Sequence, residues 1–159
     1  MSAQTQTVSP AARRAARLAA VQALYQMEVS GVSPETVAQD LLDGRLPLSE
    51  AGPIDADADI VLFRTIVEGA VAQQSAVDTM IARKLAEGWR LERIDSVARA
   101  ILRAGVVELW RRADVPTAVV IDEYVEIAKA FFDGAEPGFI NGALDGCARA
   151  VRDEGLGGA

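Results

Sequence analysis

Residues 9–28, S-P-A-A-R-R-A-A-R-L-A-A-V-Q-A-L-Y-Q-M-E, decide the fold because they have the composition of one long helix. Ser9 is a preferred N-cap residue, and Pro10 suits the first helical position, where its missing N–H costs nothing. Alanine dominates the remainder, and alanine enters a helix at the lowest free-energy cost. The stretch therefore predicts a helix from residue 9 to about residue 28.

Three arginines lie on one side of this predicted helix. At 100° per residue, Arg13, Arg14 and Arg17 fall within about a third of the circumference. They extend toward the N-terminus an apolar stripe that includes Leu24 and Tyr25. We expect the C-terminal half of the helix to be buried and the N-terminal half to project a cationic face.

These three cations lie near the N-terminus of the predicted helix, where positive charge destabilises an isolated helix. The positive end of the macrodipole opposes each cation by roughly a few tenths of a kcal/mol, and the first two turns contain no acid. Single-stranded RNA would offset this cost, because arginine binds phosphate bidentately and stacks on bases. The alternative is that arginine, a good helix former, only keeps this end soluble. The helix by itself leaves both interpretations open.

The composition bounds the size and the charge of the protein. A chain of 159 residues suits one domain or two tightly joined halves, and half of its residues are hydrophobic. Few aromatics and abundant Ala, Leu and Val favour helices over sheets. The net charge is −7, so any contact with RNA must be a local patch that outweighs the surrounding field.

Several classes of chemistry are excluded. The absence of histidine rules out Ser-His and Cys-His nucleophiles and His-ligated metal sites. Neither G-x-x-x-x-G-K nor G-x-G-x-x-G occurs. Asp122 and Glu126 lie four residues apart without a matching carboxylate pair on a second helix, so we interpret them as a solvated acidic face. We predict a protein that is not an enzyme and uses no metal or cofactor.

The location is predicted from what the sequence lacks. The single cysteine, Cys147, cannot form an internal disulfide, and no apolar run approaches the ~20 residues of a membrane span. The start, M-S-A-Q-T-Q-T-V, lacks the charged beginning and apolar middle of a signal peptide. We expect a cytoplasmic protein with no membrane contact.

The hydrophobic periodicity predicts an all-α chain of about six helices, and no segment alternates as a strand does. Gly31 breaks the chain after the first helix, and Ser33 and Pro34 repeat the cap-and-proline signal. We expect five more helices, at about residues 33–43, 60–85, 95–112, 117–131 and 139–151. Gly69 and the polar Gln73-Gln74-Ser75 are sites where the long helix can bend, although nothing there stops it, and Gly88 ends it. Asp95 is an N-cap candidate for the helix that follows. Gly142 and Gly146 are spaced for the close approach of another helix.

The expected organisation is one helical domain at residues 9–152. A disordered leader at 1–8 precedes it, and a flexible tail at 153–159 follows. Residues 44–55, with two prolines, two glycines and no periodicity, predict a mobile loop. This loop separates two helices from four.

The sequence leaves two possible roles, core packing or ligand contact, for each of two aromatic residues. Phe139 follows Pro137 and Gly138, and it is either a core residue or an exposed ring for stacking. Tyr25 either packs or contacts a partner through its hydroxyl.

Taken together, five segments resemble the NusB family of bacterial transcription antitermination factors. They are A-R-R-A-A-R-L-A-A-V-Q-A-L-Y-Q at 12–26, V-A-R-A-I-L-R at 97–103, E-L-W-R-R-A-D-V-P at 108–116, V-V-I-D-E-Y-V-E-I-A-K at 119–129 and F-I-N-G-A-L-D at 139–145. The resemblance implies six to seven helices in two small helical bundles packed across one another.

The resemblance also implies a function. Members bind the boxA segment of nascent ribosomal RNA leaders together with the ribosomal protein NusE. They join other Nus factors on RNA polymerase, which supports ribosomal RNA transcription. By position, Arg13, Arg14, Arg17 and Phe139 match RNA contacts, and Tyr25 matches a tyrosine at the NusE interface.

Two other functions stay open as alternatives. The chain is then a helical interaction module that forms a homodimer through its arginine helix, or it partners a separate rRNA-modifying enzyme. A pulldown would show the separate enzyme, and light scattering with and without RNA would show a dimer.

Overall fold

A computed structural model describes residues 8–43, 58–85 and 88–156 of the chain. Within them the chain forms seven α-helices and one short 3₁₀ turn. These elements are α1 (Pro10–Ser30), α2 (Pro34–Leu42), α3 (Ile60–Ala72), α4 (Gln74–Lys84), η1 (Leu91–Arg93), α5 (Ser96–Arg111), α6 (Thr117–Phe131) and α7 (Glu136–Glu154). The described residues contain no strand, and the all-α prediction is confirmed.

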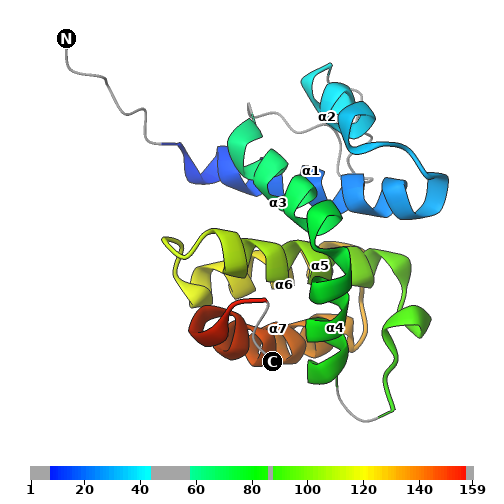
Figure 1. The fold of residues 1–159 in the computed structure, drawn as a ribbon, viewed down its shortest axis with the longest axis vertical. Coiled ribbons are helices and arrows are strands. Elements are labelled where there is room, and N and C mark those ends of the chain that lie inside the picture. Colours follow the sequence, from blue (N-terminus) through cyan, green and yellow to red (C-terminus); the bar gives the residue numbers. More distant parts are fainter. Residues whose placement is uncertain (1–7, 44–57, 86–87, 157–159) are drawn as a thin grey trace.

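The helices lie in two groups, with α1, α2 and α3 in the upper half of Figure 1 and α4 to α7 in the lower half. Helix α5 joins the groups, because it packs against α1 and α3 on one side and against α4, α6 and α7 on the other. Its apolar residues are almost completely buried, and one hydrophobic core runs through both groups. The two bundles therefore share a single core.

The local signals for helix starts and stops act as predicted. The Ser9 hydroxyl accepts a hydrogen bond from the Ala12 N–H at 3.1 Å, and Asp95 accepts one from the Val97 N–H at 2.8 Å. Gly31 ends α1 with φ 70°, a left-handed conformation that glycine adopts without steric cost. These short-range contacts need no tertiary partner, which is why the sequence reveals them.

The single helix predicted over residues 60–85 is wrong, because the chain breaks at Gln73 with φ −124° and ψ 30°. There the chain passes from the upper bundle to the lower one, and α3 and α4 each pack on a different part of α5. The sequence around Gln73 contains no strong helix breaker. Tertiary packing imposes this break.

The last helix also differs from its predicted limits. It begins at Glu136 rather than at Phe139, because Pro137 lies in the first turn, where its missing N–H is tolerated. It continues to Glu154, and Leu156 beyond it is buried. Of the tail predicted at 153–159, Asp153 and Glu154 are helical with exposed side chains, and Leu156 supplies an apolar side chain to the core.

Close helix approach occurs at glycines other than the predicted pair. A Cβ on Gly69 would lie 2.7 Å from Val107 Cγ1, and one on Gly105 would lie 2.8 Å from Leu144 Cδ2. In the predicted pair, a Cβ on Gly142 would meet nothing within 4 Å, and one on Gly146 would be in ordinary van der Waals contact with the Lys84 side chain at 3.5 Å. Gly69 and Gly105 thus let α5 approach α3 and α7, a pairing that spacing alone does not specify.

Three predictions fall on chain outside the described residues. They concern the leader up to residue 7, the loop at 44–55 and the end of the tail at 157–159. These remain predictions.

Candidate nucleic-acid interface

The first turns of α1 form a cationic end that α3 holds in place. Ser9 caps α1, and the backbone carbonyl of Ala12 accepts a hydrogen bond from the Asp59 N–H at 3.0 Å. The first turn contains no acidic residue. From this fixed end the three arginines take different directions, which the sequence did not separate.

Arg17 is a buried structural residue in this arrangement, with a side chain only 3% exposed. Its Nε and Nη2 donate to both carboxylate oxygens of Glu108 on α5, at 2.8 to 3.2 Å. The Tyr124 hydroxyl on α6 donates to Glu108 Oε1 at 2.8 Å. One buried carboxylate therefore ties α1, α5 and α6 together.

The protonation states in this cluster favour the charged pair. Burial lowers the pKa of Arg17, but its hydrogen bonds to Glu108 and the charge of that carboxylate outweigh burial and leave the pKa raised. Burial raises the pKa of Tyr124 well above its usual value, and the charge of Glu108 adds to the shift. Arg17 thus stays cationic and Tyr124 stays a neutral donor.

Arg14 points outward, and its side chain is 67% exposed. Its Nε donates to Glu123 Oε1 on α6 at 3.2 Å, and Glu123 also lies 4.0 Å from Arg17 Nη1. Only the Nε of Arg14 is engaged in the described part of the chain, so both terminal nitrogens are available to a ligand.

Arg13 is partly exposed and forms no ion pair with any described residue. It lies close to the turn between α5 and α6, where Asp114 accepts two hydrogen bonds from Arg112. The Arg112 hydrogen bond lowers the pKa of Asp114, and the charge of Arg13 contributes to the same shift. Arg13 therefore lies within the electrostatic reach of this carboxylate but forms no ion pair with it, and Asp114 takes its hydrogen bonds from Arg112 instead.

The other two predicted residues lie away from this end. Tyr25 is 37% exposed on the second half of α1, and its hydroxyl has no hydrogen bond to any described residue. Phe139 is half-buried at the start of α7, where Trp89 covers one face of its ring. The structure brings Arg13 and Arg14 together, but neither Tyr25 nor Phe139 joins them.

The sequence analysis did not identify Glu108 and Glu123, the two carboxylates that pair with Arg17 and Arg14. Glu108 stands within the apolar run V-V-E-L-W and is completely buried, as are its neighbours Val107 and Leu109. An acid in such a run signals a buried partner, because a carboxylate is almost never buried unpaired. Glu123 gave no comparable signal, since it lies on a face with other acids.

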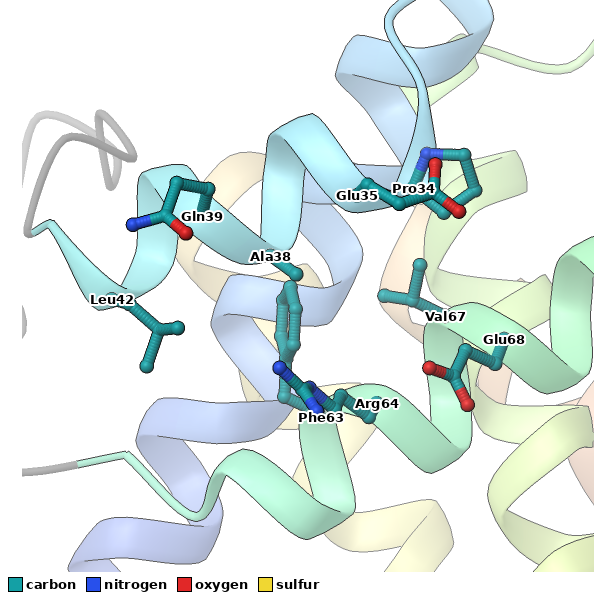
Figure 2. A pocket seen from close by; sticks show the side chains of 9 residues that line it. All are labelled: Pro34, Glu35, Ala38, Gln39, Leu42, Phe63, Arg64, Val67 and Glu68. Carbon is teal, nitrogen blue, oxygen red and sulfur yellow. The ribbon is translucent and has the colours of Figure 1, made fainter.

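A small-molecule site is the other kind of site to consider. Figure 2 shows a hollow between α2 and α3, where Ala38 and Leu42 face Phe63 and Arg64. Its volume is about 340 Å³, and charged and apolar side chains share its lining.

Among the described residues, no group of three acidic or cysteine side chains is placed to hold a metal ion. No described helix is long and apolar enough to cross a membrane. The cationic end of α1 is the candidate functional site, because the terminal nitrogens of Arg14 there are exposed and no described residue occupies them.

Comparisons with known proteins place the chain in a family. The model of the NusB family matches residues 14–149. The transcription antitermination protein NusB of Caulobacter vibrioides is 55% identical over 141 residues, which cover 89% of this chain and 95% of that protein. The protein of the same description from Maricaulis maris is 51% identical over 142 residues, which cover 89% of each chain.

Solved structures agree with the sequence comparisons. A NusB structure from T. maritima superposes with a TM-score of 0.70 at 31% identity and covers 90% of this chain and 93% of its own. A second structure, described as NusB and NusE in complex with dsRNA, has a TM-score of 0.71 at 24% identity and shows the same fold over 89% of this chain and 99% of its own. The chain belongs to the NusB family.

Proposed function

We propose that this chain is a transcription antitermination factor that binds boxA-type RNA of ribosomal RNA leaders together with the ribosomal protein NusE. The observation that carries the proposal is the pair Arg13 and Arg14 at an end of α1 that has no acid in its first turn. The relatives named transcription antitermination protein NusB support it. The protein acts without catalysis, in the cytoplasm, and meets RNA polymerase through other Nus factors.

The geometry divides the predicted contacts into two roles. Arg13 and Arg14 bind phosphates through their terminal nitrogens, which no described residue occupies, whereas the Nε of Arg13 is buried and the Nε of Arg14 donates to Glu123. Arg17 contributes by fixing the helix that presents them, since its own donors are engaged with Glu108. Tyr25 offers an unoccupied hydroxyl to the protein partner.

The charge distribution sets the expected affinity. Two phosphate contacts on a single strand give a log-log salt slope of about −1.4, since each contributes roughly 0.7. The net charge of −7 opposes RNA elsewhere on the surface. The chain alone therefore binds RNA weakly, and NusE extends the surface and raises the affinity.

The test measures binding of a boxA-containing RNA with and without NusE. Arg13→Ala/Arg14→Ala should weaken binding by at least about tenfold and bring the salt slope close to zero. Arg64→Ala/Arg149→Ala is the matched control, because it removes two exposed arginines from α3 and α7. Equal losses in both double variants would show that only net charge matters.

Light scattering on the same samples tests the alternative of a homodimer. A monomer that binds RNA supports the proposal. A dimer that dissociates in Arg13→Ala/Arg14→Ala, with no RNA bound by the wild type, would assign the cationic end to self-association instead.

A further inference from the structure

A stacked aromatic pair lies at the other end of the molecule. Trp89 follows α4 and is 49% exposed, an unusual state for the largest apolar side chain. Its ring stacks on Phe139 of α7 with centroids 4.4 Å apart and an interplanar angle of 26°. Phe139 in turn packs against the core. Trp89 is therefore the outer ring of the pair, and Phe139 is the support beneath it.

The chain on both sides of Trp89 is basic. Residues 83–93 carry four basic and two acidic side chains, a net charge of +2 in a chain of net charge −7. The basic residues are Arg83, Lys84, Arg90 and Arg93. All four are exposed, and none forms an ion pair within the described ranges.

The fold places one of these cations, Lys84, along the helix that carries Phe139. A Cβ on Gly146 would lie 3.5 Å from both Cβ and Cδ of Lys84, so the stem of Lys84 runs along α7. Gly146 comes seven residues, about two turns, after Phe139, which puts both positions on one face of α7. Lys84 and Trp89 therefore cover neighbouring parts of the same helix face.

An exposed aromatic ring flanked by unpaired cations is the combination that binds single-stranded nucleic acid, with bases stacking on the ring and phosphates meeting the cations. The indole N–H of Trp89 also has no acceptor among the described residues, so it is available to a base or a phosphate. A purely apolar partner surface would leave the four cations without counter-charges.

We infer that Trp89 stacks on a base of the RNA whose phosphates Arg13 and Arg14 hold, and that Phe139 positions the Trp89 ring rather than stacking itself. This inference rests on the proposed function. In Figure 1 the end of α4 lies in the lower part of the view, whereas α1 begins at its upper left. The RNA is thus held at two separate places on one protein.

The site contains its own optical probe. Trp110 is the only other tryptophan, so Trp110→Phe leaves Trp89 as the sole indole. Titrating this variant with boxA RNA should quench its fluorescence, with the same midpoint as the anisotropy of labelled RNA. In the same background Trp89→Ala should weaken RNA binding about tenfold, and Trp89→Phe should retain most of the affinity.

A second variant tests the role of Phe139. Phe139→Leu keeps an apolar side chain against the core but removes the ring under Trp89, so it should weaken RNA binding while the melting temperature changes little. Ile127→Leu on α6, another half-buried apolar residue, is the control and should leave RNA binding unchanged.

The outcomes separate this inference from the proposed function. If RNA binds and depends on Arg13 and Arg14, but Trp89 fluorescence and the affinity of Trp89→Ala do not change, the stacking site is wrong and the function stands. If Trp89→Ala weakens NusE binding alone, the surface is a protein contact and the inference is overturned. If no RNA binds even with NusE present, both fall together.

Discussion

The arginines at the start of α1 and those in the middle of α5 look alike in sequence but differ in what surrounds them. On α5, Arg103 donates to both oxygens of Asp78 at 2.8 and 2.9 Å and to Glu28 at 2.7 Å. Arg99 also pairs with Glu28. On α1, Arg14 has one ion-pair partner in the described chain and Arg13 has none.

This difference teaches how to tell a structural arginine from one that binds a ligand. Arg99 and Arg103 connect α5 to α1 and α4, and their donors are largely occupied by the protein. Arg17 belongs with them, although it lies on the same helix as Arg13 and Arg14. Burial and donor occupancy, rather than position in the sequence, define the class of each arginine.

The largest effect is expected from Arg17→Ala. Removing one partner of a buried ion pair leaves the Glu108 carboxylate uncompensated, which destabilises a protein by about 3–5 kcal/mol. Urea unfolding measures this loss. Arg14→Ala breaks an exposed pair and should cost no more than about 1 kcal/mol. Equal costs for the two variants would contradict the division between them.

Arg103→Ala should have the next largest effect on stability. It removes charge-assisted hydrogen bonds to Asp78 and Glu28 that link three helices, so we expect a loss of about 1–3 kcal/mol. At a temperature where the variant stays folded, its RNA affinity should match that of the wild type. If Arg103→Ala weakened RNA binding without changing the free energy of unfolding, Arg103 would be a ligand-binding residue and not a structural one.

Acid should weaken the same connection on α5. The hydrogen bond from Arg99 lowers the pKa of Glu28, and the charges of Arg99 and Arg103 lower it further. A carboxyl group with a lowered folded pKa stabilises the protein above its unfolded value of about 4.3, and this contribution is lost as the pH falls through the folded pKa. The stability gap between wild type and Glu28→Gln, measured by urea unfolding, should therefore close at acidic pH. A gap independent of pH would exclude this electrostatic role.

The smallest effect is expected from Glu123→Gln. Its carboxylate occupies the Nε of Arg14 and would lie roughly 7 Å from a phosphate bound there, so removing its charge should tighten RNA binding about threefold in water. Glu35→Gln, which removes an exposed carboxylate from α2, is the control and should change the affinity less. Weaker binding by Glu123→Gln would mean that the carboxylate orients Arg14 for RNA.

The sequence predicted the cationic end of α1, but it did not show which of its arginines is buried and which are exposed. Spacing places Arg13, Arg14 and Arg17 on one side of a helix, and this is all that helical periodicity contains. Their environments depend on Glu108 and Glu123, which lie about a hundred residues further along the chain. Similarly, the sequence left Phe139 between core and stacking roles, whereas its contact with Trp89 depends on how α7 meets the end of α4.

By itself the sequence determined the helical class, the caps at Ser9, Ser33 and Asp95 and the end of α1 at Gly31, because these depend on contacts within a few residues. Tertiary structure alone decided the break at Gln73, the close approaches at Gly69 and Gly105 and the burial of Leu156. The physical reason is that burial and pairing are properties of distant segments brought together. A local pattern fixes where a side chain stands on its helix, but not which neighbour covers it.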